Sequence, residues 1–217
     1  MYIRDIVISA KESEANFRQF NFETTFLESL YLRGLGKVYT KKTDKIIIEL
    51  GFEKLDKNTH SRSGSVALIE INFNFEAYWK ENATERKKMA LNCLHKGATL
   101  LAESNKWEVS KFQEAYNQCL KLKLQNKWYW KKRLFSPNKK FKTELLCTFN
   151  MTEFQCLATI RDSDDKEKVK KVIIKTKPHE IYFVHFLGKA KWLNNQIIVF
   201  QDKNGVEYDR IELQKTS

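Results

Sequence analysis

The stretch NKWYWKKRLFSPNKKFKTELLCTFNMTEFQC, residues 126–156, decides the fold of the second half of the chain. Over most of its length the side chains alternate in character with a period of two, which is typical of strands. A turn is expected at Ser136–Asn138, because proline presets the first turn position. A second turn centred on Met151-Thr152 pairs Phe149 with Phe154 and Cys147 with Cys156. The stretch therefore predicts two consecutive β-hairpins.

Further strands are expected downstream of this stretch, at Val169–Thr176, Ile181–Leu187, Gln196–Gln201 and Val206–Leu213. Asn204-Gly205, between the last two, is a strong signal for a tight turn. These strands complete an antiparallel β meander over residues 128–213.

The middle of the chain, residues 82–126, changes to the helical period of 3.6 residues. Asn82 followed by Glu85 offers an N-cap with an acid at the third helical position. Apolar residues then follow helical spacing to about Ser104, at Leu91, Leu94, Ala98 and Leu101. A second helix is expected from Ser110, with the apolar face Phe112, Ala115, Tyr116, Cys119 and Leu122. The short link between the two predicts an antiparallel helical hairpin.

Residues 1–79 have mainly strand-like patterns. The expected strands are Tyr2–Ser9, Phe17–Phe22, a hairpin of Lys37–Thr40 with Lys45–Leu50, and Val66–Phe75. Strands, a helical pair and more strands indicate the α+β class. We therefore predict a single α+β domain over residues 1–217, with antiparallel β-sheets and the central two-helix hairpin packed on one face.

The net charge of +12 is concentrated in the second half of the chain. Residues 1–110 hold 17 basic and 15 acidic side chains, a difference of +2, whereas residues 111–217 hold 22 and 12, a difference of +10. Such a basic half favours anionic partners. However, 31 of the 39 basic residues are Lys, which recognises phosphate and base edges less specifically than Arg does.

Several classes of function are not expected from this sequence. No apolar run reaches 18 residues, so we predict no membrane span, and the first five residues, Met1–Asp5, do not begin a secretory signal. The Cys and His spacings fit no metal site, and no phosphate-binding loop or nucleophile motif is present. We therefore expect no cofactor, no catalytic residues and a non-enzymatic protein. The four cysteines form no C-x-x-C pair and are too few for a disulfide scaffold in a chain of this length, which indicates a reducing cytoplasm.

Aromatic and basic side chains are interleaved in the first hairpin, which makes it the candidate binding surface. The candidate residues are Trp128, Tyr129, Trp130, Lys131, Lys132, Arg133, Phe135, Lys139 and Lys140. On a strand, one face carries Trp128, Trp130, Lys132 and Leu134, and the other carries Tyr129, Lys131, Arg133 and Phe135. Because this arrangement divides the cations between two faces, a solvated edge strand is the preferred interpretation. A surface for a protein or an anionic ligand and a nucleic-acid surface are the alternatives.

Three segments resemble small cytoplasmic immunity proteins of bacterial toxin systems. They are LNCLHKGATLLAESNKW (91–107), FQEAYNQCLKLKLQNKWYWKKRLFSPNKKFK (112–142) and LGKAKWLNNQIIVFQDKNG (187–205). The resemblance implies a protein that binds and neutralises a cognate toxin. Since the chain is basic, the toxin is expected to present an acidic or neutral surface. A nucleic-acid-binding protein that uses the basic half is the alternative function, and the oligomeric state is left open.

Overall fold

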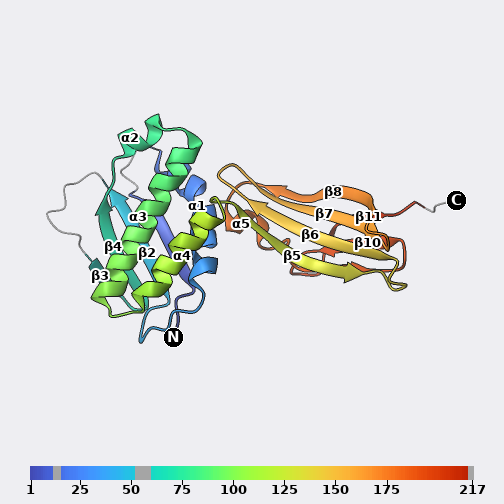
Figure 1. Ribbon diagram of the computed structural model, residues 1–217, viewed down its shortest axis with the longest axis horizontal. Helices are drawn as coiled ribbons and strands as arrows, with labels where there is room; N and C mark the ends of the chain where they lie inside the picture. The colour runs from blue at the N-terminus through green and yellow to red at the C-terminus, as the bar shows by residue number, and fades with distance from the viewer. Residues whose placement is uncertain (12–15, 52–59, 215–217) are drawn as a thin grey trace. The chain divides into compact units, whose positions relative to one another are not determined.

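The computed structural model describes residues 1–11, 16–51 and 60–214. It combines helices with antiparallel-rich sheets, which confirms the mixed α+β class. The chain forms two compact units, Met1–Asn126 and Lys127–Ser217, whereas the sequence predicts one domain. The division falls where the helical hairpin gives way to the β meander (Figure 1). None of the described helices is long and apolar enough to span a membrane.

The sheet of the first unit contains parallel pairs, which corrects the expected antiparallel arrangement there. Its strand order is β1 (Asp5–Ala10), β2 (Lys45–Gly51), β4 (Val66–Asn72) and β3 (His60–Ser63). Strands β1, β2 and β4 run parallel, and only β3 pairs antiparallel, with β4. The hairpin expected between Lys37–Thr40 and Lys45–Leu50 is wrong, because β2 pairs with β1 on one side and β4 on the other, and Tyr39 instead forms an isolated bridge with Tyr2. A helix connects β1 to β2, since parallel neighbours need such a crossover.

That helix, α1 (Phe17–Leu35), includes the segment Phe17–Phe22 that was predicted as a strand. The buried positions recur at helical spacing, at Phe20, Thr24, Leu27, Tyr31 and Leu35. Six residues are too few to separate this period from the strand period of two, since aromatic residues occupy both patterns. The strand prediction is therefore wrong, and the helical period becomes clear only over the full length of Phe17–Leu35.

Side chains of α1 also satisfy the free edge of β1. The N–H of Ile8 donates to Glu28 at 2.9 Å, and the N–H of Ala10 donates to Asn21 at 3.0 Å. Because an uncovered edge strand offers unpaired donors to other chains, this helix closes the sheet on the β1 side.

The remaining helices of the first unit are α2 (Phe75–Lys80), α3 (Ala83–Ser104) and α4 (Val109–Lys121). The N-cap predicted at Asn82 is confirmed, because its side chain accepts from the N–H groups of Thr84 and Glu85. Helix α3 lies close to the sheet at Gly97, where an added Cβ would meet Ile48 at 2.7 Å. The predicted helical hairpin is present (Figure 1), with α3 packed on the sheet and α4 packed on α1 and α3.

The second unit consists of two antiparallel sheets. One has the order β5 (Asn126–Phe135), β6 (Phe141–Phe149), β7 (Phe154–Asp162) and β8 (Glu167–Thr176). The other has the order β11 (Glu207–Glu212), β10 (Ile197–Gln201) and β9 (Lys189–Trp192). Both predicted hairpins are confirmed, and β6 and β7 pair in the expected register, with Phe149 opposite Phe154 and Cys147 opposite Cys156.

One predicted strand of the second unit, Ile181–Leu187, is wrong. The segment instead begins with the short helix α5 (Glu180–Phe183), where the His179 side chain accepts from the N–H of Ile181 at 3.2 Å. Phe183 is buried and stacks on Phe154 at 3.7 Å between ring centroids. This packing and the cap stabilise a helical turn where apolar alternation alone favours a strand.

The two sheets of the second unit pack face to face. On β6 and β7 the buried side chains alternate, at Leu145, Cys147, Phe149, Phe154, Cys156, Ala158 and Ile160, and the other sheet contributes the buried side chains Ile198, Val199, Phe200 and Ile211. At one side Lys171 of β8 pairs with Asp209 of β11 at 2.6 Å. At the other side β5 lies next to β9, as described below. The sandwich therefore has two sides, each made of one edge strand from each sheet.

Candidate functional site: a basic edge of the second unit

Strand β5 has the alternation that the sequence predicts. Trp128 faces the core, where its ring centroid lies 5.9 Å from that of Phe154. On the other face Tyr129 is 46% exposed and Phe135 is 52% exposed. Lys131 and Arg133 lie between these two aromatic residues and are also exposed. This face of β5 therefore carries aromatic and cationic side chains together.

A hydrogen bond joins β5 to the edge strand of the other sheet. The indole N–H of Trp192, on β9, donates to the backbone oxygen of Leu134 at 3.2 Å. The Trp192 ring also stacks on Phe141 at 6.2 Å between ring centroids, with 18° between the planes. Near the end of β5 the side-chain oxygen of Asn195 accepts from the N–H of Asn138 at 2.9 Å. These contacts place β9 beside β5 and its turn.

This juxtaposition adds two exposed lysines of β9 to those of the hairpin. We call the combined set the basic edge: Lys127, Lys131, Lys132, Arg133, Lys139, Lys140, Lys189 and Lys191. All eight side chains are exposed. The basic edge thus spans two strands that are more than fifty residues apart in the sequence.

No residue of the basic edge forms an ion pair with the described residues. Of the other ten Lys and Arg side chains in residues 127–214, six form ion pairs: Lys142, Arg161, Lys168, Lys171, Lys175 and Arg210. The contrast has a simple origin in the sequence, because β5, the β5–β6 turn and β9 contain no Asp or Glu. The positive charge of the edge is therefore not neutralised within the described part of this unit.

The carboxylates of the second unit all lie outside β5, its turn and β9. They are most frequent at the β7–β8 turn and on β11. There they are engaged: the hydrogen bond from Lys168 holds the pKa of Asp162 below its ordinary value, and that from Lys142 does the same for Asp165. The side of the sandwich formed by β5 and β9 therefore carries only cations, whereas the side formed by β8 and β11 carries both cations and carboxylates.

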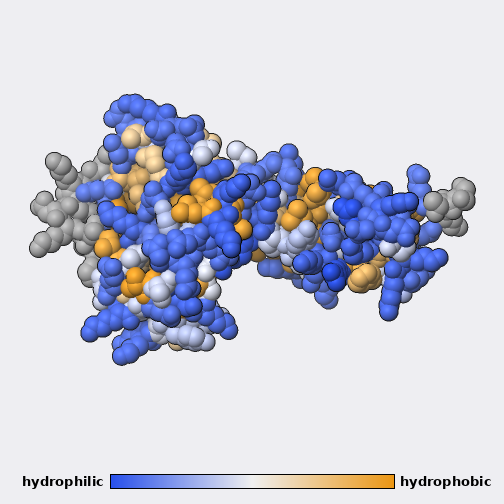
Figure 2. Space-filling model, viewed as in Figure 1, coloured by the Kyte–Doolittle hydropathy of each residue, from blue (hydrophilic) through white to orange (hydrophobic). Residues whose placement is uncertain are grey.

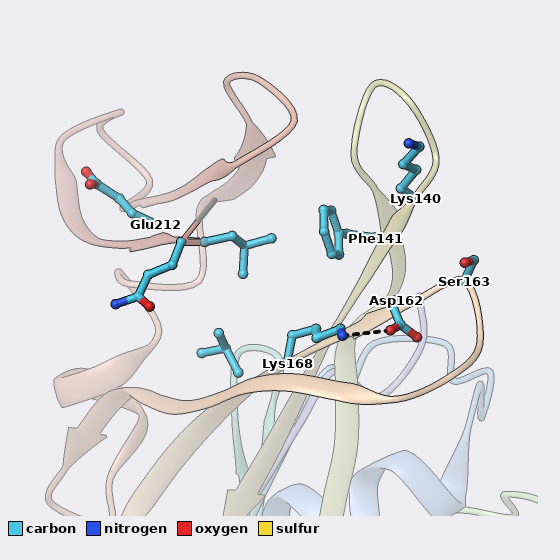
Figure 3. Close-up of a pocket in the computed structure, with 9 residues that line it drawn as sticks. Lys140, Phe141, Asp162, Ser163, Lys168 and Glu212 are labelled. Atoms are coloured by element: carbon cyan, nitrogen blue, oxygen red, sulfur yellow. Dashed lines mark ion pairs between the residues drawn. The ribbon is translucent and has the colours of Figure 1, made fainter. Parts of the chain in front are cut away.

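A hollow of about 510 Å³ opens beside the basic edge at Lys140 (Figure 3). Phe141 lines it from the β5–β6 hairpin, and Asp162 and Lys168 line it from the region of the β7–β8 turn. Asp162 pairs with Lys168 at 2.9 Å and also accepts from the N–H groups of Asp164 and Lys166. Glu212, the other acid that lines the hollow, pairs with Arg210 at 3.6 Å, so both carboxylates of the hollow already lie beside cations.

The structure places the nine candidate residues in three settings. Trp128 and Trp130 are half-buried toward the core, and Lys139 and Lys140 lie in the turn. The other five are exposed on β5: Tyr129, Lys131, Lys132, Arg133 and Phe135. Lys132 bends toward Tyr129, with its Nζ 5.9 Å from the ring centroid, so a cation from the core-facing side also reaches the edge.

Three residues of the edge region were missed in the sequence: Lys189, Lys191 and Trp192. Their signal is the alternation in KAKW, residues 189–192, which matches a short strand with one charged face. The strand was not predicted because four residues give a weak pattern. No local signal indicates that it lies next to β5.

The described residues contain no group of three or more His, Cys, Asp or Glu side chains that could hold a metal ion. Burial raises the pKa of Cys93 to about 11 and that of Cys119 to about 12. A thiol with a raised pKa is a poor nucleophile at neutral pH. Comparisons with protein-family models, with curated proteins and with solved structures give no significant match.

Proposed function

We propose that this chain is a non-enzymatic binding protein whose basic edge docks a protein partner with an acidic surface. The observation that carries this proposal is the absence of any ion pair at the eight cations of the edge among the described residues. Charges that are arranged without internal partners are available to an incoming surface of opposite sign. Such complementarity accelerates association and selects the partner.

The composition of the edge fits a contact that combines charge with a few aromatic anchors. Tyr129 and Phe135 are about half exposed and flank Lys131 and Arg133. Tyrosine and arginine are enriched at the centres of protein interfaces. Hydrophilic residues cover most of the visible face of the second unit, with hydrophobic residues in small groups (Figure 2). A mainly polar interface is therefore expected.

Within this proposal, the partner class is a cognate bacterial toxin, which the chain binds and neutralises. The support is the resemblance to immunity proteins. Two of its three segments, 112–142 and 187–205, contain β5 and β9, the two strands that form the basic edge. The electrostatics favour a toxin with an acidic surface, because a basic toxin surface would be repelled.

The test compares two variants with the same loss of charge. In the first, Lys131, Lys132 and Arg133 are changed to Gln. In the second, three exposed lysines that form no ion pair with the described residues, Lys166, Lys170 and Lys203, are changed to Gln. A partner captured from the native host should bind the native chain and the second variant, and should associate with the first about tenfold more slowly at low salt. Equal binding by both variants would contradict the proposal.

A second function, single-stranded nucleic-acid binding, is favoured by one observation. Tyr129, Lys131, Arg133 and Phe135 share an exposed face, and single-strand binders combine stacking rings with cations in this way. It predicts that a labelled oligonucleotide binds the native chain with an affinity that falls steeply with salt. Replacing Tyr129 and Phe135 by Ser should then weaken binding by about tenfold or more. No binding of the oligonucleotide at low salt would exclude this second function.

A further inference from the structure

The first unit contains a hollow of about 580 Å³. None of its lining residues belongs to the basic edge, so binding of a ligand there would be a function beyond the one proposed above. Its lining includes four basic residues and two aromatic residues: Tyr39, Lys41, Lys42, Arg62, Lys106 and Trp107. They come from the segment before β2, from β3, and from the segment between α3 and α4. Among the residues that the structure describes, no Asp or Glu lines the hollow.

The four cations of this hollow form no ion pair with the described residues. Of the acids nearest in the sequence, Asp44 is held by Arg4, which lowers its pKa, and Glu108, next to Trp107, accepts from the Ser110 hydroxyl at 3.5 Å. Arg62 donates its Nε–H to the backbone oxygen of Gly64 at 3.0 Å, which leaves its two terminal nitrogens for other acceptors. Four uncompensated cations around one hollow favour a ligand with concentrated negative charge, such as a phosphate group.

The two aromatic residues add an apolar, flat component to the lining. Tyr39 is 72% exposed, the largest exposed fraction among the large hydrophobic side chains of the described residues. Trp107 is half-buried and stacks on Phe112, with 15° between the ring planes. An exposed tyrosine and a fixed tryptophan at a basic hollow are suited to a ring that stacks, as nucleobases do on aromatic side chains.

The backbone around these residues is held in place by hydrogen bonds. The N–H of Thr43 donates to the Thr40 side-chain oxygen at 3.0 Å, and the N–H of Thr40 donates to the backbone oxygen of Met1 at 3.0 Å. These bonds close the turn that carries Lys41 and Lys42. The N–H of Trp107 donates to Ala102 at 2.8 Å and fixes the segment after α3. Because this backbone is held before binding, a ligand does not have to order the segments that carry the lining side chains.

We infer that this hollow binds a nucleoside monophosphate, with the base against the aromatic side chains and the phosphate at the cations. The volume lies within the range of about 300–1,000 Å³ that is typical of small-molecule sites. A neutral ligand would leave the four cations without a partner, and inorganic phosphate alone would leave the two aromatic side chains without a ring to stack on. The site is independent of the basic edge, so either function can fail without the other.

Isothermal titration calorimetry on the full chain tests this inference with AMP, GMP, CMP and UMP, and with adenosine and inorganic phosphate as partial ligands. At least one mononucleotide should bind with one site per chain and about tenfold more tightly than either partial ligand. Changing Lys41 and Lys42 to Gln should weaken it about tenfold or more. Tyr39→Ser should also weaken it, and since this side chain is mostly exposed the variant should fold normally.

The matched control changes two exposed lysines elsewhere in the first unit, Lys96 and Lys121, to Gln. This variant should bind the mononucleotide as the native chain does. No mononucleotide binding at about 1 mM, or an equal loss in the two double variants, would overturn the inference. Binding of a single-stranded oligonucleotide without binding of any mononucleotide would also overturn it. The variant at Lys131, Lys132 and Arg133 should keep mononucleotide affinity, which separates this site from the basic edge.

Discussion

Trp192 donates its indole N–H to the backbone oxygen of Leu134 at 3.2 Å, across 58 residues of sequence. This bond connects the edge strand of one sheet to the edge strand of the other. Together with the hydrogen bond from the N–H of Asn138 to Asn195, it holds the two lysines of β9 beside the cations of β5. These two hydrogen bonds and the stacking of Trp192 on Phe141 thus define the extent of the basic edge.

Replacing Trp192 by Phe should therefore destabilise the second unit. The substitution removes the hydrogen bond and keeps an aromatic ring against Phe141. We expect a loss of about 1 kcal/mol in the free energy of unfolding, the usual net value of such a bond. Urea denaturation measures this loss, and an unchanged midpoint would show that the bond does not connect the strands in solution.

Replacing Gly97 by Ala should destabilise the first unit, because helix α3 packs closely on the sheet at this position. An added Cβ would lie 2.7 Å from Cγ1 of Ile48. Alanine favours the helix by about 1 kcal/mol, but overpacking costs typically about 1–3 kcal/mol, so Gly97→Ala should lower stability on balance. In an Ile48→Ala background, which lacks both γ carbons that the new Cβ would meet, Gly97→Ala should cost less stability in thermal unfolding. A Gly97→Ala variant with higher stability would contradict this close packing.

Thr143 offers a substitution that should increase stability. It is fully buried, and its hydroxyl has no hydrogen-bond partner among the described residues. Burial of an unpaired hydroxyl costs about 1–3 kcal/mol. Thr143→Val removes the hydroxyl and keeps the branched shape, so the denaturation midpoint should rise. Thr143→Ser, which retains the hydroxyl and loses a methyl group, should lower it.

Stability should fall at alkaline pH. Burial raises the pKa of Cys93 to about 11 and that of Cys119 to about 12, above the ordinary value of about 8.5 for an unfolded thiol. The folded state therefore keeps protons that the unfolded state releases as the pH rises. The stabilisation is complete below about pH 8.5 and decreases up to about pH 11–12, by as much as about 1.4 kcal/mol per pH unit for each thiol.

The measurement is the free energy of unfolding between about pH 8 and pH 11. A variant with Cys93 and Cys119 changed to Ala should show a shallower decrease over this interval. Equal slopes for the native chain and this variant would show that neither thiol is buried as described. The two proteins are compared by the slope of the free energy of unfolding against pH, because this slope depends on the ionisation of the thiols and not on the absolute stability of the variant.

The sequence predicts those parts of the fold that depend on local pattern. The Asn82 cap, the two helices after it and the register of Cys147 with Cys156 follow from spacing within a few residues. The parallel pairing of β1, β2 and β4 does not, because it depends on a crossover helix that begins with strand-like aromatic residues at Phe17–Phe22.

The candidate site divides in the same way. The exposed face of β5 follows from alternation, and Tyr129 with Lys131, Arg133 and Phe135 can be read from the sequence. The contribution of β9 cannot, since no local pattern encodes which edge strands of two packed sheets lie side by side. The hollow near Trp107 also depends on contacts between segments that are far apart in the chain.

The most direct test of the central claim is the association rate of the captured partner with two double variants. One changes Lys131 and Lys132 of β5 to Gln, and the other changes Lys189 and Lys191 of β9 to Gln. If the two strands form one surface, each variant should associate several-fold more slowly than the native chain at low salt, with the difference decreasing as salt increases. Native association rates for the β9 variant would contradict the basic edge as a single binding surface.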